Sequence, residues 1–112
     1  MPLRRVVIFP ARRVLELYEG TQRIRSYPIA VGKPSTPTPP GYYTIATKTM
    51  YPGGVFGSRW LGLSIPHYGI HGTNNPLSIG QAVSKGCIRM HNHDVEDLYQ
   101  IVEIGTPVTI QS

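Results

Sequence analysis

Short apolar runs separated by Pro and Gly make up most of this chain. The runs are rich in Val, Ile, Leu and Tyr, which predicts strands. The predicted strands are residues 4–9, 13–19, 23–31, 42–49, 60–65 and 106–110. Glu19-Gly20-Thr21 is predicted to form a hairpin turn. The Pro-rich stretch 32–41 and the Gly-rich stretch 50–59 are predicted to be loops, the first of them running over the surface.

One segment near the end of the chain has a helical period instead. Its apolar positions follow the i, i+3, i+4, i+7 spacing of one helix face: Val95, Leu98, Tyr99 and Val102. The helix is predicted to begin at Asn92 or Asp94, either of which can cap it, and Gly105 ends it. Many short strands and one helix predict a mostly β fold, a β-sandwich or barrel-like domain with the helix packed on it.

Length and charge narrow the class of protein. A chain of 112 residues is one domain, residues 1–112, and its 12 Gly and 11 Pro are typical of a turn-rich fold. The net charge is +5, and residues 20–93 contain seven Lys or Arg and no carboxylate. That distribution argues against glycoside hydrolysis by a carboxylate pair and against Mg²⁺-assisted chemistry. It also leaves no nearby carboxylate to orient a histidine in the central region.

The single cysteine lies in a setting typical of a nucleophile. If residues 85–89 are extended, Lys85, Cys87 and Arg89 share one face, and the two cations would lower the pKa of the thiol below its ordinary value of about 8.5. His71 is the candidate general base, and the amides of Gly86 and Cys87 are candidate donors to an oxyanion. The alternative is that Cys87 is a small buried hydrophobic residue, but a packing cysteine has no need of flanking cations.

A metal site is the alternative interpretation of the histidines in this region. His67 and His71 have the i, i+4 spacing that suits a helix, yet Pro66 and Gly69 argue against a helix there. On a strand the two histidines would lie about 13 Å apart, too far to share an ion. We therefore expect neither a metal nor another cofactor, and we expect His93 to be an ordinary surface residue.

The residues around these candidates resemble the signature of the YkuD-type L,D-transpeptidases. The signature is a histidine followed after a fixed gap by Ser/Thr-x-Gly-Cys, matched here by residues 71–75 and 84–92. Further family landmarks occur in family order at residues 27–33, 38–41, 52–54, 56–57, 60–64 and 105–108. The resemblance implies a mostly β sandwich of mixed sheets and a cysteine-dependent acyl transfer on the stem peptides of peptidoglycan, with Cys87 as nucleophile and His71 as base, oriented by the main-chain carbonyl of Gly72.

Other positions of the motif region carry supporting or substrate-binding hypotheses. Ser84 and Gly86 are expected to support the site. Lys85 stands where many family members have a second histidine, so it keeps a charge but not that side chain. Arg89 is the candidate for gripping a substrate carboxylate through two hydrogen bonds. The remaining candidates for substrate contact are Tyr68, Asn74, Trp60 and Asn92, and Asn92 is alternatively only a helix cap.

Two alternatives stay open at this point. Water in place of an amine acceptor would make the same site an L,D-carboxypeptidase. A non-catalytic module that binds an anionic wall polymer or nucleic acid would use the basic surface and would be insensitive to Cys87. The basic residues are dispersed and form no nucleic-acid motif, so no nucleic acid is expected as partner.

The resemblance implies a location at the cell wall, outside the cytoplasm, or in a spore. The first apolar run, residues 6–9, is too short for a signal peptide or a membrane span, and we expect neither in this sequence. The sequence does not predict the oligomeric state.

Overall fold

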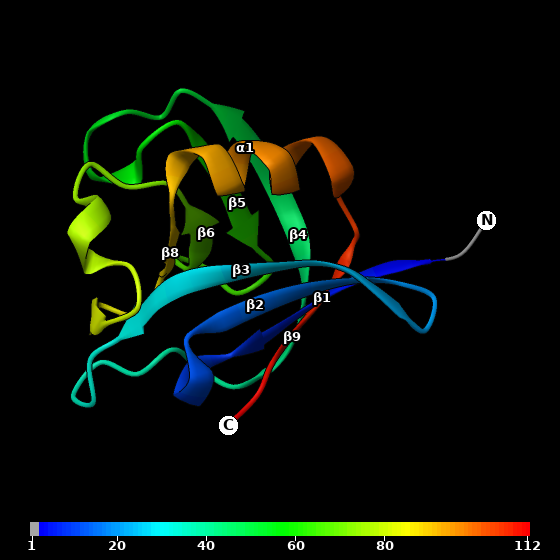
Figure 1. Cartoon of the computed structure of the whole chain (residues 1–112), viewed down its shortest axis with the longest axis horizontal. Coiled ribbons are helices and arrows are strands. Elements are labelled where there is room, and N and C mark those ends of the chain that lie inside the picture. The colour runs from blue at the N-terminus through cyan, green and yellow to red at the C-terminus, as the bar shows by residue number, and fades with distance from the viewer. Residues whose placement is uncertain (1–2) are drawn as a thin grey trace.

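The predicted strands join into one continuous sheet in the computed structural model, which describes residues 3–112 (Figure 1). The strands are β1 (Arg4–Phe9), β2 (Val14–Glu19), β3 (Gln22–Gly32), β4 (Gly41–Met50), β5 (Arg59–Leu63), β6 (Gly69–His71), β7 (Ala82–Ser84), β8 (Ile88–Met90) and β9 (Pro107–Ile110). The three-residue strands β6, β7 and β8 were not predicted individually. Single 3₁₀ turns occupy Pro10–Arg12, Gly54–Phe56 and Pro76–Ser78.

The sheet closes on itself, so the sandwich prediction needs correction. The strand order is β2-β1-β9-β4-β5-β6-β8-β3-β7, and β2 also pairs with β3. The reason lies in the two longest strands, which each pass from one side of the molecule to the other. β3 pairs with β2 through residue 28 and with β8 at residues 29–30, while β4 pairs first with β9 and then with β5. Two separate layers are thereby joined into a closed, barrel-like sheet (Figure 1).

The hairpin between β2 and β3 forms as predicted. Glu19 pairs with Gln22 across a two-residue turn, and Gly20 has a positive φ of 60°, a conformation that glycine adopts without steric cost. The alternating residues of the strands point inward and build one core, whose fully buried members include Ile8, Leu15, Leu17, Ile29, Ile45, Leu61, Ile70, Ile88 and Met90. Burying each such side chain stabilises the fold by about 1.5–3 kcal/mol relative to exposure.

The helix α1 (Asn92–Ile101) covers one part of this core (Figure 1). Val95, Leu98 and Val102 are buried in the core cluster, and Tyr99 packs against it, which confirms the predicted apolar face. The predicted cap is wrong: His91 holds the N-cap position, and no side chain caps the helix. At the other end, the Lys48 ammonium donates to the carbonyls of Tyr99 and Val102, each at 2.8 Å, which satisfies carbonyls left free where the helix ends.

A second contact fixes the middle of α1 to β3. The Tyr27 hydroxyl donates to Asp97 at 2.6 Å, and the Arg25 guanidinium donates to the same carboxylate oxygen at 3.0 Å. These two donors hold the pKa of Asp97 below its usual value. The helix contacts β5 and β6, so its position bears directly on the strands that carry the candidate site. Within residues 3–112, no helix has the length and apolar character needed to cross a membrane.

Candidate active site

Three neighbouring strands divide their side chains between the core and the candidate site. In β5, β6 and β8, the side chains of Leu61, Ile70 and Ile88 face the core and are buried. The opposite face carries the other set, because side chains alternate along a strand. There, Trp60 pairs with His71 and His71 pairs with Arg89 in register. Cys87, just before β8, lies two positions from Arg89, next to the residue that pairs with Ile70.

The His71 ring is held in one orientation. Its Nδ1–H donates to the Gly72 carbonyl at 2.6 Å, the hydrogen bond that the family resemblance implied. The ring stacks on Trp60 with centroids 5.6 Å apart and meets Phe56 edge-on at 5.1 Å. With the proton fixed on Nδ1, the neutral ring presents Nε2 as a free proton acceptor.

Burial determines the protonation of His71. The side chain is only 4% exposed, and this desolvation lowers its pKa to about 4, against a smaller opposing effect of the Gly72 carbonyl and with a further lowering by Arg89. His71 is therefore a neutral base at physiological pH.

The thiol of Cys87 does not have the lowered pKa that the sequence suggested. Partial burial raises it, and the amide of Gly69 and the charge of Arg89 only offset that effect in part. Lys85 contributes nothing, because residues 85–87 form a turn between β7 and β8 and not the extended run that was predicted. Lys85 is exposed, and it is not among the groups that shift the pKa of Cys87. The protein thus holds a neutral thiol and a neutral imidazole.

The turn at residues 84–87 is fixed by the buried hydroxyl of Ser84. That hydroxyl donates to the Cys87 carbonyl at 2.7 Å and accepts from the Gly86 amide at 3.1 Å. Gly86 has a φ of 120°, a region that strongly favours glycine. A Cβ at Gly86 would also come within 2.5 Å of the Tyr68 ring. Tyr68 therefore covers the turn, and this packing accounts for its half-buried position.

The Ser84 contact changes the expected oxyanion donors. The Gly86 amide is engaged by Ser84 and is not free to bind a developing charge. The Cys87 amide makes none of the hydrogen bonds found within residues 3–112 outside regular strands and helices. Of the two amides predicted to donate to an oxyanion, only that of Cys87 is free to do so.

The Pro-rich loop between β3 and β4 contributes to the site, although it was predicted to run over the surface. The Thr38 side chain is 6% exposed and donates to the Gly86 carbonyl at 2.9 Å. Thr36 donates to the Ser84 carbonyl, also at 2.9 Å. Thr38 therefore braces the turn before Cys87, whereas Thr36 holds the loop to the end of β7. In the sequence, residues 38–41 stood out only as a family landmark, with no sign of a contact to the turn before Cys87.

Asn92 lies next to Gly72, and its side chain bonds to backbone atoms. Its Oδ1 accepts from the amides of Ser58 at 3.2 Å and Thr73 at 3.1 Å, and its Nδ2 donates to the Thr73 carbonyl at 3.1 Å. Ser58 is in turn bonded to Glu96 of α1 at 2.7 Å. Asn92 thus joins the loop before β5 to the residues after His71, and Ser58 and Thr73 were not anticipated from the sequence.

The Trp60 ring packs directly against the backbone of Gly62 and Gly69. A Cβ on Gly69 would approach the Trp60 ring to 2.6 Å, and one on Gly62 would approach its Nε1 to 3.0 Å. The flat contact lets Trp60 reach His71 as a stacking partner, while Phe56 packs on both rings at 5.1 Å. Phe56 was recognised only as a family landmark. Its neighbours here give it a physical role beside the base.

Of the remaining predicted residues, some lie close to His71 and Cys87 and others do not. Arg89 is half-buried and lies next to both His71 and Cys87, whose pKa values it influences. Asn74 is exposed and makes none of the side-chain hydrogen bonds found among residues 3–112. His91 and His93 stack on each other at 5.4 Å. Within the same residues, no three His, Cys, Asp or Glu side chains gather as metal ligands would.

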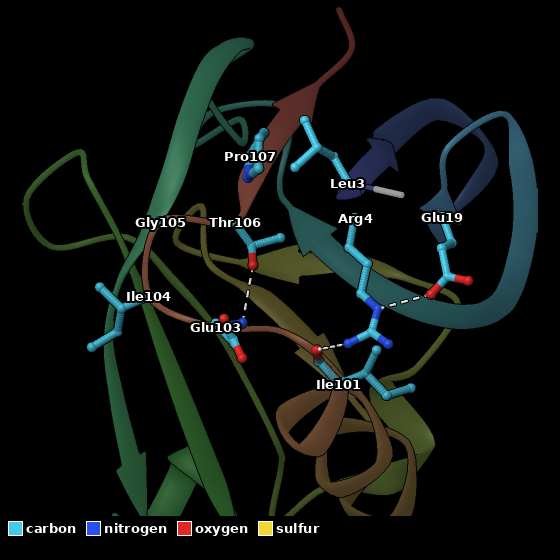
Figure 2. Close-up of a pocket in the computed structure, with 9 residues that line it drawn as sticks. All are labelled: Leu3, Arg4, Glu19, Ile101, Glu103, Ile104, Gly105, Thr106 and Pro107. Carbon is cyan, nitrogen blue, oxygen red and sulfur yellow. Dashed lines mark hydrogen bonds and ion pairs between the residues drawn. The ribbon is translucent and has the colours of Figure 1, made fainter. Parts of the chain in front are cut away.

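A cavity of about 600 Å³ lies elsewhere, where the end of α1 and the start of β9 meet β1 and β2 (Figure 2). Its lining includes Arg4, which bonds to Glu19 at 3.1 Å and to the Ile101 carbonyl at 2.9 Å. None of the candidate site residues lines it. The structure therefore separates this cavity from the Cys87 and His71 pair.

Comparison with known proteins gives a consistent result. Residues 3–110 match the family model described as YkuD, L,D-transpeptidase catalytic domain. The YkuD protein of Bacillus licheniformis is 56% identical over 106 residues, 95% of this chain and 64% of that protein. The YkuD protein of Bacillus subtilis is 58% identical over 98 residues, 88% of this chain and 60% of that protein. The chain therefore spans less than two thirds of the length of these relatives.

Solved structures share the fold at low sequence identity. An L,D-transpeptidase from Mycobacterium smegmatis superimposes with a TM-score of 0.87 at 19% identity, over 99% of this chain and 59% of that one. The catalytic domain of the Enterococcus faecium L,D-transpeptidase gives 0.81 at 23% identity, over 98% of both chains. These matches support the closed, mostly β architecture with one helix.

Proposed function

Because this chain belongs to the YkuD family of L,D-transpeptidase catalytic domains, we propose that it cross-links peptidoglycan stem peptides through a thioester on Cys87. The donor is a tetrapeptide stem, whose terminal D-residue is released, and the acceptor is an amine of a second stem. Water as acceptor would give the carboxypeptidase reaction at the same site. No cofactor takes part in this chemistry.

One observation carries the proposal. His71 is held with its proton on Nδ1 by the Gly72 carbonyl, so that Nε2 is the free basic atom, and its strand β6 pairs with β8, which begins directly after Cys87. A general base needs a fixed orientation and an unprotonated nitrogen at the working pH, and the lowered pKa of about 4 provides the second condition. A packing role for Cys87 would need neither feature.

The pKa directions suggest how the first step proceeds. Since the thiol pKa is raised and that of the imidazole is lowered, the resting pair is neutral and not a preformed thiolate. We infer that Nε2 takes the thiol proton as sulfur attacks the carbonyl carbon before the terminal D-residue. The carbonyl π electrons move to oxygen, where the Cys87 amide donates to them. Collapse breaks the C–N bond, and the imidazolium returns the proton to the leaving amine.

The second half of the reaction reverses these roles. The acceptor amine attacks the thioester carbon, Nε2 of His71 takes the amine proton, and the thiolate leaves and is reprotonated. The closed turn at 84–87 keeps the Cys87 amide next to sulfur in both halves. The same donor therefore serves both tetrahedral intermediates.

The test is the intact mass of the protein after incubation with a tetrapeptide muropeptide or, separately, with a carbapenem. We expect a single adduct on the wild type, and none on Cys87→Ala, because only the thiol can form the thioester. His71→Ala should form the adduct about 10²- to 10⁴-fold more slowly, the usual contribution of a general base. Cysteine-independent, salt-sensitive binding to wall polymer without any adduct would contradict the proposal and favour the binding module.

Arg89 is proposed to bind a carboxylate of the donor stem. Its guanidinium is half-buried beside both candidate catalytic residues and makes none of the ion pairs found among residues 3–112. Such a group can grip a carboxylate with two parallel hydrogen bonds, whereas lysine cannot.

Arg89→Ala is therefore expected to raise the KM for the donor about tenfold or more, and Arg89→Lys should restore it only in part. Steady-state kinetics with varied donor measures both variants. An unchanged kcat/KM in Arg89→Ala would remove this role.

A further inference from the structure

The three peptide groups around Cys87 are each held by one side-chain hydroxyl. Ser84 accepts from the amide of the peptide that precedes Gly86 and donates to the carbonyl of the peptide that follows Cys87. The middle peptide, between Gly86 and Cys87, is held by Thr38, which donates to the Gly86 carbonyl at 2.9 Å. Thr38 comes from the distant loop between β3 and β4, 48 residues earlier in the chain.

The middle peptide contains the one available oxyanion donor. In a planar trans peptide, the C=O and the N–H point in opposite directions. By bonding to the Gly86 carbonyl, Thr38 therefore sets the direction of the Cys87 N–H, which points away from the 33–40 loop. Rotation of this peptide would move the N–H through the same angle.

Such a restraint is needed because of Gly86. Its φ of 120° and the adjacent Tyr68 ring leave no room for a side chain, so the position requires glycine. Glycine in turn offers little resistance to rotation of the peptide that follows it. The residues next to Cys87 in the sequence therefore do not fix the direction of the Cys87 N–H.

Thr38 is itself fixed in place. Its hydroxyl accepts from the Gly32 amide at 3.0 Å, and the side chain is 6% exposed. Gly32 permits this approach, because a Cβ there would lie 2.8 Å from the Thr38 nitrogen. The Thr38 hydroxyl therefore accepts from Gly32 and donates its single proton to the Gly86 carbonyl. The direction of the bond to Gly86 is thus set by Gly32, at the end of β3.

We propose that Thr38 is a positioning residue for the oxyanion step: it aims the Cys87 amide at the carbonyl oxygen under attack. This inference rests on the proposed acyl transfer through Cys87. Thr38 acts only through the peptide and does not touch the substrate. It should matter when a carbonyl is attacked and should not matter when Cys87 reacts without forming an oxyanion.

The experiment compares two reagents on Thr38→Val. A carbapenem acylates sulfur through an oxyanion: the S–C bond forms, the ring C–N bond breaks, and the nitrogen takes the proton from His71. Iodoacetamide alkylates sulfur by displacing iodide, and no oxyanion forms. We expect carbapenem acylation to slow by about 10- to 100-fold, the scale of a misdirected oxyanion donor, and alkylation to change by less than about twofold.

Two further variants sharpen the test. Thr38→Ser retains the hydroxyl and should acylate at nearly the wild-type rate, and it remains informative if Thr38→Val does not fold. Thr36→Val removes a hydroxyl of the same loop that bonds to the Ser84 carbonyl and not to Gly86. Its acylation should stay within about twofold of wild type. Equal slowing in Thr36→Val and Thr38→Val, or a Thr38→Ser variant that is as slow as Thr38→Val, would overturn the proposal.

An amide spectrum separates this inference from the proposed function. In ¹⁵N-labelled protein, the Cys87 amide resonance should shift and exchange faster with solvent in Thr38→Val but not in Thr36→Val. A wild type that is alkylated by iodoacetamide but never acylated would contradict the transpeptidase proposal. In that case, an unchanged Cys87 amide in Thr38→Val would still overturn the positioning role by itself.

Discussion

The cavity beside Arg4 and the site around Cys87 are opposite kinds of surface. The cavity offers about 600 Å³, and its rim includes Leu3 and Ile104, which are 85% and 66% exposed. At the site, His71, Thr73 and Ser84 are almost completely buried, and most of their polar contacts go to backbone atoms. The volume of the cavity shows only that a small molecule would fit there. Converging hydrogen bonds that fix single peptide groups mark where atoms must be held for a reaction.

The strongest way to sharpen this contrast is the pH dependence of stability. The pKa of His71 falls from an ordinary value of 6.5 to about 4 on folding. The unfolded chain therefore binds more protons than the folded chain between these pH values. The contribution of His71 to the free energy of unfolding is fully present above pH 6.5 and is lost as the pH drops toward 4. The full loss amounts to roughly 3 kcal/mol, from 1.36 kcal/mol per unit of pKa.

Urea unfolding of wild type and His71→Gln at several pH values measures this effect. The slope is taken between pH 6.5 and 5, because Glu16 and Asp97, whose pKa values are lowered, add to the loss only below about pH 4.5. We expect the slope to be about one proton smaller in His71→Gln. Parallel curves for the two proteins would show that His71 is not buried in its neutral form.

Asn92 tests whether the partly exposed hydrogen bonds beside the site also stabilise the fold. Asn92→Ala leaves the amides of Ser58 and Thr73 without their acceptor; because these bonds are exposed or only partly buried, the loss should be about 0.5–1.5 kcal/mol, the net contribution of a hydrogen bond. The midpoint of thermal unfolding should fall by about 4–8 °C per kcal/mol for a domain of this size. Asn92→Asp keeps the acceptor and loses only the donor to Thr73, so its loss should be smaller. A wild-type midpoint in Asn92→Ala would show that solvent replaces these bonds.

The cavity provides the smallest expected effects. Arg4→Ala breaks an exposed ion pair with Glu19 and should change the free energy of unfolding by no more than about 1 kcal/mol. Ile104→Ser, in an exposed side chain of the cavity rim, should change it by a similar or smaller amount. Neither should alter carbapenem acylation by more than about twofold. A large loss of acylation in either variant would connect the cavity to the chemistry.

The fold could be predicted from the sequence wherever the hydrophobic pattern was local. Six strands, the turn at Gly20 and the face of α1 follow directly from alternation and helical period. The strands β6, β7 and β8 are too short, at three residues each, for alternation to be visible. Closure of the sheet depends on the pairing of β2 with β3 and on the length of β3 and β4, which only long-range contacts reveal.

For the site, the sequence named the candidate reactive residues and missed most of the contacts that hold them. Cys87, His71 and the Gly72 carbonyl could be named from the motif, because their chemistry is tied to residue type. The direction of the thiol pKa was wrong, since burial cannot be judged from neighbouring charges alone. Thr38 was missed because it acts on the turn from 48 residues away. Asn92 was predicted to contact substrate or to cap the helix, and in the structure its side chain bonds to backbone atoms of Ser58 and Thr73.

The position of β9 has a consequence for how this protein folds. β9 lies between β1 and β4, pairing Val108 with Val6 on one side and with Tyr43 on the other. Until residues 107–110 have been synthesised, the chain can form only an open sheet with β1 and β4 as unpaired edges. Such edges are templates for pairing with other chains. Closure also joins residues about 100 positions apart, which is entropically slow, so the barrel closes only after residues 107–110 have been made.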